Sequence, residues 1–356
     1  MTGLTGRSLP VVRLGLIGAG SMGRLHAAVI RDLPDAELVA VAEPDLGAQE
    51  LVQDLVPSAN GYADHASMLA AESLDAVIVA TPEPLHRAPV EAAAHIGLHV
   101  LVEKPMALDP LDCDAMLDAC QTAGVVFMVG YILRFEPTYA ALHAAVDAGR
   151  FGRPVAMYAR RCATIQEARR LGGRVSALEY VGVHDIDQVL WNHGAPVRRV
   201  RARGARGRVW EELGTPDTIW TTIEFTDGTV AVIEAGWALP HAWGGWPAPP
   251  GWAPFGDVRF DLTGTAGFAS IDLRQMNLVG IDDDGWMFPD TRHWPQVAGG
   301  IGGALRAEVE DFVRCVRTRQ PPLVDGEQGR EVTRLLALAM RSLAEDRDVA
   351  YGEAAA

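Results

Sequence analysis

The stretch Val11-Val-Arg-Leu-Gly-Leu-Ile-Gly-Ala-Gly-Ser-Met-Gly23 decides the fold of this chain. Its first part is an apolar run that predicts a buried strand ending at Ile17, and residues 26–33 have helical character. Between strand and helix stands the pattern G-x-G-x-x-G, which is typical of a turn that binds a dinucleotide. The first glycine allows the tight turn, the second lets the backbone approach a pyrophosphate, and the third allows close packing of helix on strand.

The residues of this turn are therefore predicted to hold a dinucleotide, because the N-terminus of the helix also offers free N–H groups to its phosphates. The predicted contacts are Gly18, Gly20, Ser21, Met22 and Gly23. A second strand, 37–42, ends at Glu43, and an acidic residue at about this distance commonly binds the ribose hydroxyls. Glu43 would repel a 2′-phosphate, and no basic residue follows in 44–47, so NAD is expected rather than NADP.

Length and composition limit the remaining possibilities. A chain of 356 residues suggests about two domains, and 49% hydrophobic with 22% charged residues is typical of a globular protein. The formal net charge of −15 argues against a nucleic-acid-binding surface. We see no membrane span and no signal peptide in the sequence. The spacing of the four cysteines is typical neither of a metal site nor of a disulfide scaffold. These features predict a protein of the reducing cytoplasm that acts on a small molecule and contains no metal.

Further strands alternate with helices up to residue 130, and they place the only lysine of the chain. Residues 74–80 and 98–102 read as buried strands, the second followed by Glu103-Lys104-Pro105. In a parallel sheet, ligands lie beyond the carboxyl ends of the strands, so Lys104 is expected on the cofactor side. Of the 31 lysine and arginine residues, all except Lys104 are arginines. An arginine side chain stays charged, whereas a lysine amine can exchange a proton. The same edge is expected to bring Thr81, Pro82, His86 and Glu103 to the cofactor.

Several segments resemble the glucose–fructose oxidoreductase, inositol dehydrogenase and rhizopine-catabolism (Gfo/Idh/MocA) oxidoreductases. These segments are 15–27, 81–107, 130–139, 149–155, 182–187 and 305–329, and the Glu-Lys-Pro element is the most specific part. The resemblance implies an α/β fold with an N-terminal Rossmann dinucleotide-binding domain at 1–130. A C-terminal α/β domain at 131–356 would contain a large, mainly antiparallel open sheet, with its last helices able to pack back on the first domain. It also makes a homodimer or homotetramer plausible.

The resemblance further implies hydride transfer between a nicotinamide and a hydroxyl-bearing carbon of a sugar, sugar derivative or cyclic polyol. Lys104 is expected to contact the reacting oxygen, and His184 in Gly182-Val-His-Asp-Ile-Asp187 is expected to be the general base. Asp187 lies on the same face one helical turn later and could bind substrate or orient a neighbour. Arg134 matches a basic position of the family and is a candidate substrate or cofactor ligand, although a surface ion pair is a comparable alternative.

The chain departs from the family four residues before His184, where polyol dehydrogenases of this group usually have an aspartate. Here the residue is Tyr180, after an altered run at 174–179. Either Glu179 supplies the carboxylate after a register shift, or Tyr180 lines the substrate pocket and donates a hydrogen bond or relays a proton with Lys104. We favour Tyr180 as a substrate-binding residue.

The tryptophans of a Pro- and Gly-rich stretch, 236–256, are another candidate substrate contact. They are Trp237, Trp243, Trp246 and Trp252. Their rings could stack on the C–H faces of a sugar, or equally form an oligomer contact. We name Trp237 as the candidate substrate ligand among them, and expect an irregular ordered loop over most of this stretch.

Two other functions stay open. The first is a non-catalytic NAD-binding regulatory protein of the same fold, which the loss of the aspartate at Tyr180 favours. The second is an aldehyde or imine reductase that uses NADPH. The presence of Lys104 and His184 argues against the regulator, and Glu43 argues against NADPH.

Overall fold

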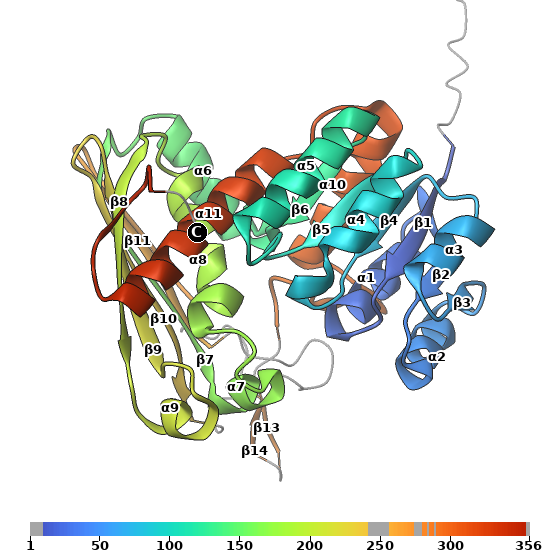
Figure 1. Cartoon of the computed structure of the whole chain (residues 1–356), viewed down its shortest axis with the longest axis horizontal. Coiled ribbons are helices and arrows are strands. Elements are labelled where there is room, and N and C mark those ends of the chain that lie inside the picture. Colours follow the sequence, from blue (N-terminus) through green and yellow to red (C-terminus); the bar gives the residue numbers. More distant parts are fainter. Residues whose placement is uncertain (1–9, 241–255, 274–279, 283–284, 288–289, 354–356) are drawn as a thin grey trace, which may run out of the picture.

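The computed structural model describes residues 10–240, 256–273, 280–282, 285–287 and 290–353, and it contains two large sheets (Figure 1). The first is six-stranded and entirely parallel, in the order β3-β2-β1-β4-β5-β6. The second is seven-stranded, in the order β12-β11-β7-β10-β9-β8-β17. Its strands pair antiparallel except for β7 with β10. The predicted fold class is therefore confirmed.

The first sheet forms because its strands are continuous apolar runs, which suits a sheet covered on both faces. Its strands are β1 (Val12–Ile17), β2 (Ala36–Ala42), β3 (Asn60–Tyr62), β4 (Ala76–Val79), β5 (His99–Glu103) and β6 (Phe127–Gly130). Between them lie α1 (Ser21–Arg31), α2 (Leu46–Leu55), α3 (His65–Ala71), the short helix η1 (Glu83–Leu85), α4 (Arg87–His95) and α5 (Pro110–Ala123). The strand order reverses at β1 and β4, which is where such sheets bind ligands.

The second sheet has one face covered by helices. Its strands are β7 (Pro154–Thr164), β8 (Val197–Ala205), β9 (Thr218–Phe225), β10 (Val230–Leu239), β11 (Asp257–Gly264), β12 (Phe268–Asp272) and β17 (Val349–Ala350). Buried and less buried residues alternate along β9 and β10, as expected for a half-covered sheet. The associated helices are η2 (Ile132–Phe135), α6 (Pro137–Asp147), α7 (Ile165–Leu171), the π-helical turn η3 (Leu178–Gly182), α8 (Val183–Trp191) and α9 (Arg208–Leu213).

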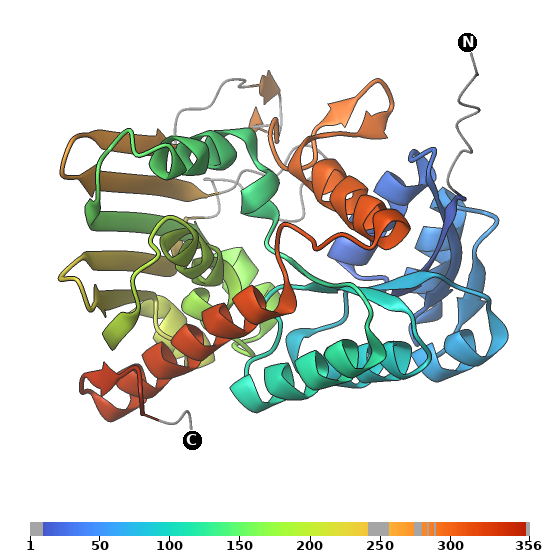
Figure 2. The ribbon, with the colours of Figure 1, turned by 90° about the horizontal axis from the view of Figure 1, so that it is seen from above.

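Two C-terminal helices connect the two sheets (Figure 2). Helix α10 (Gly303–Thr318) packs against α1 and β1 of the first domain. Helix α11 (Gly326–Glu345) contacts α5 and β6 on one side and α8 and β8 on the other. Short two-residue and three-residue strands, β13 (Gly280–Asp282), β14 (Gly285–Met287), β15 (Gln296–Val297) and β16 (Gly300–Ile301), precede α10. Within the described ranges, no helix combines the length and the apolar character that crossing a membrane requires.

Candidate active site

A cleft of about 980 Å³ lies beyond the carboxyl ends of the strands of the first sheet. It runs from the glycine turn and Glu43, past Thr81 and Lys104, to Tyr180 of the second domain. Pockets of this size are those that hold cofactors and small substrates. The cleft therefore brings Lys104 and Tyr180 together with the residues predicted for the dinucleotide, except Gly23 and His86, which do not line it.

The glycine turn has the shape that a pyrophosphate requires. Gly18 has a φ of +98°, and a Cβ there would lie 2.7 Å from the carbonyl oxygen of Ala80. A Cβ on Gly23 would lie 2.0 Å from the carbonyl oxygen of Gly18, so only glycine allows α1 to pack this closely. A Cβ on Gly20 would meet nothing within 4 Å, and this residue begins α1 without a side-chain cap. The first N–H groups of α1 therefore remain available to phosphate oxygens.

Glu43 lies at the adenosine end of the cleft, at the carboxyl end of β2. Its carboxylate accepts hydrogen bonds from the backbone N–H groups of Ala19, at 2.8 Å, and Asp45, at 3.0 Å. Asp64 lines the same end of the cleft. A 2′-phosphate would meet two carboxylates here, whereas ribose hydroxyls can donate to them, so these residues fit NAD better than NADP.

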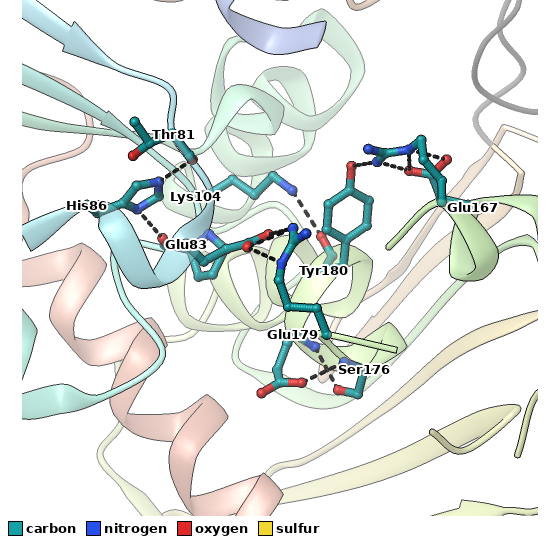
Figure 3. A network of polar contacts seen from close by, with 11 residues as sticks. Thr81, Glu83, His86, Lys104, Glu167, Ser176, Glu179 and Tyr180 are labelled. Carbon is teal, nitrogen blue, oxygen red and sulfur yellow. Dashed lines mark hydrogen bonds and ion pairs between the residues drawn. The ribbon is translucent and has the colours of Figure 1, made fainter. Parts of the chain in front are cut away.

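Thr81 and Pro82 line the cleft, but His86 lies just behind it (Figure 3). The imidazole of His86 is buried, with Nε2 at 2.9 Å from the carbonyl oxygen of Thr81 and Nδ1 at 3.1 Å from that of Pro105. Burial lowers the pKa of His86. His86 thus joins the loop after β4 to the loop after β5, and its effect on a cofactor would be through the position of these loops. The hydroxyl oxygen of Thr81 is buried without a hydrogen-bond partner among the described residues, so it can serve a ligand.

Lys104 reaches into the substrate end of the cleft (Figure 3). Its Nζ donates a hydrogen bond of 3.0 Å to the backbone carbonyl of Tyr180 and lies 4.4 Å from the centroid of that ring. Burial lowers the pKa of Lys104, although the charges of Glu103, Glu83 and Glu167 act in the opposite direction. A lysine with a lowered pKa gives up its proton more readily than an unperturbed one, which favours a role in proton transfer.

Tyr180 is held on the π-helical turn that precedes α8, a type of turn frequent at functional sites. Its hydroxyl oxygen lies 2.8 Å from Nη2 of Arg170. Burial raises the pKa of Tyr180, which disfavours its ionisation. Lys104 contacts the carbonyl and the ring face of this residue, so the geometry gives a pocket residue and no direct hydroxyl-to-amine relay. Glu179 instead accepts a hydrogen bond of 2.6 Å from the backbone N–H of Ser176. This bond caps the turn, and Glu179 does not line the cleft.

His184 is buried in the first turn of α8, behind the wall of the cleft. Burial, followed by the positive charges of Lys104 and Arg161, lowers the pKa of His184 well below its usual value. Nδ1 has no hydrogen-bond partner within the described part of the chain. His184 is therefore a neutral imidazole close enough to Lys104 for their protonation to be linked.

Three residues predicted to bind substrate lie outside the cleft lining. Arg134 and Asp187 bind each other at 2.6 Å, with side chains only 2% and 1% exposed. Each satisfies the charge of the other, which leaves neither facing a ligand in this structure. Trp237 belongs to β10 and is fully buried, with its ring centroid 5.9 Å from that of Tyr180. It supports Tyr180 from behind and offers no face for a sugar. Trp243, Trp246 and Trp252 fall outside the described residues.

Glu103 lies directly behind Lys104 in a buried group that also contains His26 and Glu308. The Glu103 carboxylate is 2.8 Å from Nε2 of His26. Burial alone would raise the pKa of Glu103, but the hydrogen bond and charge of His26 and the charge of Lys104 outweigh it and lower that pKa. One ligand atom from each of the three residues lies within 4.8 Å of the others, so this is the set among the described residues with the composition and spacing to hold a metal ion.

Comparison with known protein families gives two sequence models that match this chain. The sequence model described as "Oxidoreductase family, NAD-binding Rossmann fold" (GFO_IDH_MocA) matches residues 12–131, and the model of the Gfo/Idh/MocA C-terminal domain matches residues 139–270. The chain belongs to the Gfo/Idh/MocA oxidoreductase family. The predicted family, oxidoreductase class and NAD cofactor are thereby confirmed.

Similar members of the Gfo/Idh/MocA family include inositol dehydrogenases. The chain is 28% identical to scyllo-inositol 2-dehydrogenase (NAD(+)) of Bacillus subtilis, over 88% of each protein. It is 26% identical to Myo-inositol 2-dehydrogenase of Thermotoga maritima, over 96% of this chain and 99% of the relative. The crystal structure of scyllo-inositol dehydrogenase from Lactobacillus casei with bound NAD(H) and scyllo-inositol has the same fold. Its TM-score is 0.81 at 21% identity, and 96% of this chain and 100% of that chain are covered.

Some residues of this Gfo/Idh/MocA site had no recognisable signal in the sequence. Arg170, Arg174 and Glu83 line the cleft, and Glu167 lies beside Arg170. They come from α7, the loop after it and η1, and the local pattern of each resembles that of an ordinary surface ion pair. Their convergence depends on the packing of the second domain against the first, which periodicity does not reveal.

Proposed function

We propose that this protein is an NAD-dependent dehydrogenase that transfers a hydride between nicotinamide and a hydroxyl-bearing carbon of a sugar or an inositol-like cyclic polyol. The observation that carries the proposal is Lys104, whose amine enters the cleft beyond the same strand ends as the glycine turn. The inositol dehydrogenases among its relatives support the substrate class. Bound NAD would supply the hydride acceptor.

In this proposal, the chain's own residues hold the substrate oxygen and remove its proton. The carbonyl of Tyr180 fixes Nζ of Lys104 at 3.0 Å, so the amine is oriented before substrate arrives. The lowered pKa of Lys104 lets the amine accept a hydroxyl proton during oxidation. His184, held neutral by burial, is the second base, and its own proton affinity rises when Lys104 is uncharged. Reduction uses the same groups in reverse.

The test is the formation of NADH by purified protein with a panel of inositol isomers and monosaccharides, together with the reverse reaction on keto sugars. Turnover of one class identifies the reacting substrate. Binding of NAD without turnover of any panel member would favour the regulatory alternative, since Tyr180 replaces the aspartate usual in polyol dehydrogenases. The ratio of kcat/KM with NAD to that with NADP tests the third alternative, because the carboxylates of Glu43 and Asp64 disfavour a 2′-phosphate.

We further propose a homodimer or homotetramer, assembled through the face of the second sheet that the helices leave uncovered (Figure 1). Trp220 of β9 is 42% exposed, which is high for a large aromatic side chain of a strand. Light scattering measures the mass in solution. The proposed contact is supported if the wild type has the mass of a dimer or tetramer and Trp220→Glu shifts the mass toward that of the monomer. A monomeric wild type would overturn the proposed assembly.

A further inference from the structure

Three cationic side chains, Lys104, Arg170 and Arg174, line the cleft together with Tyr180, and Figure 3 shows Lys104 beside Tyr180. Nζ of Lys104 lies 4.4 Å from the ring centroid, and Cζ of Arg170 lies 5.8 Å from it. Arg170 also contacts the hydroxyl of Tyr180 at 2.8 Å. Arg174 lines the same cleft and pairs with Glu83 at 3.0 Å across the boundary between the two domains. Of these three side chains, the proposed dehydrogenase function uses only Lys104.

Each arginine is far more exposed than its acidic partner. The side chains of Arg170 and Arg174 are 39% and 42% exposed, whereas those of Glu167 and Glu83 are each 8% exposed. The guanidinium groups therefore offer a ligand in the cleft more accessible surface than the two carboxylates do. Within the described residues, Nη1 of neither arginine makes a hydrogen bond, although the other nitrogens are used.

The neighbouring carboxylates do not restore a negative charge to this end of the cleft. Asp185 is buried against Arg161 at 2.9 Å, and Asp187 is buried against Arg134 at 2.6 Å. Tyr180, which lines this end of the cleft, has an uncharged side chain. An anionic substrate group that approaches Lys104 thus finds two exposed arginines, whose own partners Glu167 and Glu83 are each only 8% exposed.

We propose that the substrate is an acidic sugar or polyol whose oxyanion group binds Arg170 and Arg174 while its reacting hydroxyl contacts Lys104. This inference rests on the proposed dehydrogenase function and narrows its substrate class. The planar guanidinium fork matches both carboxylate and phosphate, so the shared chemistry is an anionic oxygen group on a polyhydroxylated carbon skeleton. Glu167 and Glu83 orient the two arginines from beneath and remain in place when the substrate binds.

The experiment compares substrates that differ only in the anionic group. Glucose, glucuronate and glucose 6-phosphate form one set, and galactose with galacturonate forms another, with myo-inositol as the neutral cyclic reference. Because charge-assisted hydrogen bonds are roughly twice as strong as neutral ones, we expect kcat/KM to be about 10-fold or more higher for one anionic member of a set. The two arms, carboxylate and phosphate, show which anion the arginines accept.

Variants then tie the preference to the two arginines. Arg170→Gln and Arg174→Gln should each lower the ratio of kcat/KM for the acid to that for the neutral sugar, by about 10-fold. Arg169→Gln is the matched control, because Arg169 is on the same helix, pairs with the exposed Glu212 and does not line the cleft. The wild-type KM for the acid should also rise with salt, which needs no variant.

The outcomes separate this inference from the proposed function. The proposal of an acidic substrate is wrong if neutral substrates are turned over equally well or better, or if the acid preference is unchanged in both arginine variants. Either result is still compatible with the proposed dehydrogenase function. If neither acidic nor neutral compounds are turned over in either direction, the dehydrogenase itself fails and the inference fails with it.

Discussion

Replacing Glu308 with glutamine should stabilise the protein, and the gain should grow with pH. Glu308 is 1% exposed on α10, and both carboxylate oxygens lack a hydrogen-bond partner among the described residues. Burial, and then the charges of Glu103 and Asp311, raise the pKa of Glu308 well above its usual value. The folded protein thus retains a proton that the unfolded chain loses, which makes stability fall as the pH rises above the ordinary glutamate pKa.

The magnitude follows from the pH interval over which Glu308 keeps its proton. Each pH unit costs about 1.4 kcal/mol of unfolding free energy, so the loss between pH 5 and pH 7 is at most about 2–3 kcal/mol. Glutamine has a similar shape and does not titrate, so Glu308→Gln should remove this slope. Near pH 5 the two proteins should differ by less than about 1 kcal/mol, because both carry a neutral side chain there.

Urea unfolding of wild type and Glu308→Gln at pH 5, 6, 7 and 8 measures the difference. Glu310→Gln on the same helix is the control, because its side chain is 51% exposed and pairs with Arg306 at the surface. That control should shift the unfolding free energy by less than about 1 kcal/mol at every pH. A Glu308→Gln protein with the wild-type pH slope, or with lower stability at pH 8, would refute the reasoning.

Other substitutions test further parts of the structure. Glu43→Ala removes the acidic ribose contact, so the KM for NAD should rise several-fold. The ratio of kcat/KM with NAD to kcat/KM with NADP should fall. Asp185→Ala leaves the buried charge of Arg161 uncompensated, so it should lower the free energy of unfolding by about 3–5 kcal/mol. The control Glu37→Ala removes an exposed ion pair and should lower it by only about 0–1 kcal/mol. Burial, and then the charge of Arg319, lower the pKa of His99 from 6.5 to about 4, and its Nδ1 accepts a backbone hydrogen bond of 2.7 Å. The stability that neutral His99 contributes is therefore present above pH 6.5 and is lost as the pH falls toward 4. Over that window, the unfolding free energy of His99→Gln, measured by denaturation, should fall less than that of the wild type.

The first domain could be predicted from the sequence because its signals are local. Apolar strands, the glycine turn and the acidic residue after β2 follow one another along the chain, and each has a direct structural meaning. The position of Lys104 followed from topology, since it comes directly after a parallel strand. The structure places its amine in the cleft with Tyr180.

The substrate end could not be predicted in the same way, because it depends on long-range pairing. Arg134 and Asp187 each matched a family position, yet their opposite charges meet and bury each other. Trp237 reads as a loop-flanking aromatic residue, but as part of β10 it faces the covered side of the second sheet. Arg170 carried no distinguishing spacing, and only the folded chain brings it to Tyr180.

The central claim is that Lys104 performs proton transfer in an NAD-dependent dehydrogenase. The most direct measurement is the rate of NADH formation by Lys104→Ala with the best substrate of the panel, alongside NAD affinity by calorimetry. We expect kcat to fall by about 100-fold or more, the usual contribution of general acid–base catalysis, while the Kd for NAD stays within a few-fold of wild type. Turnover within a few-fold of wild type would contradict the claim.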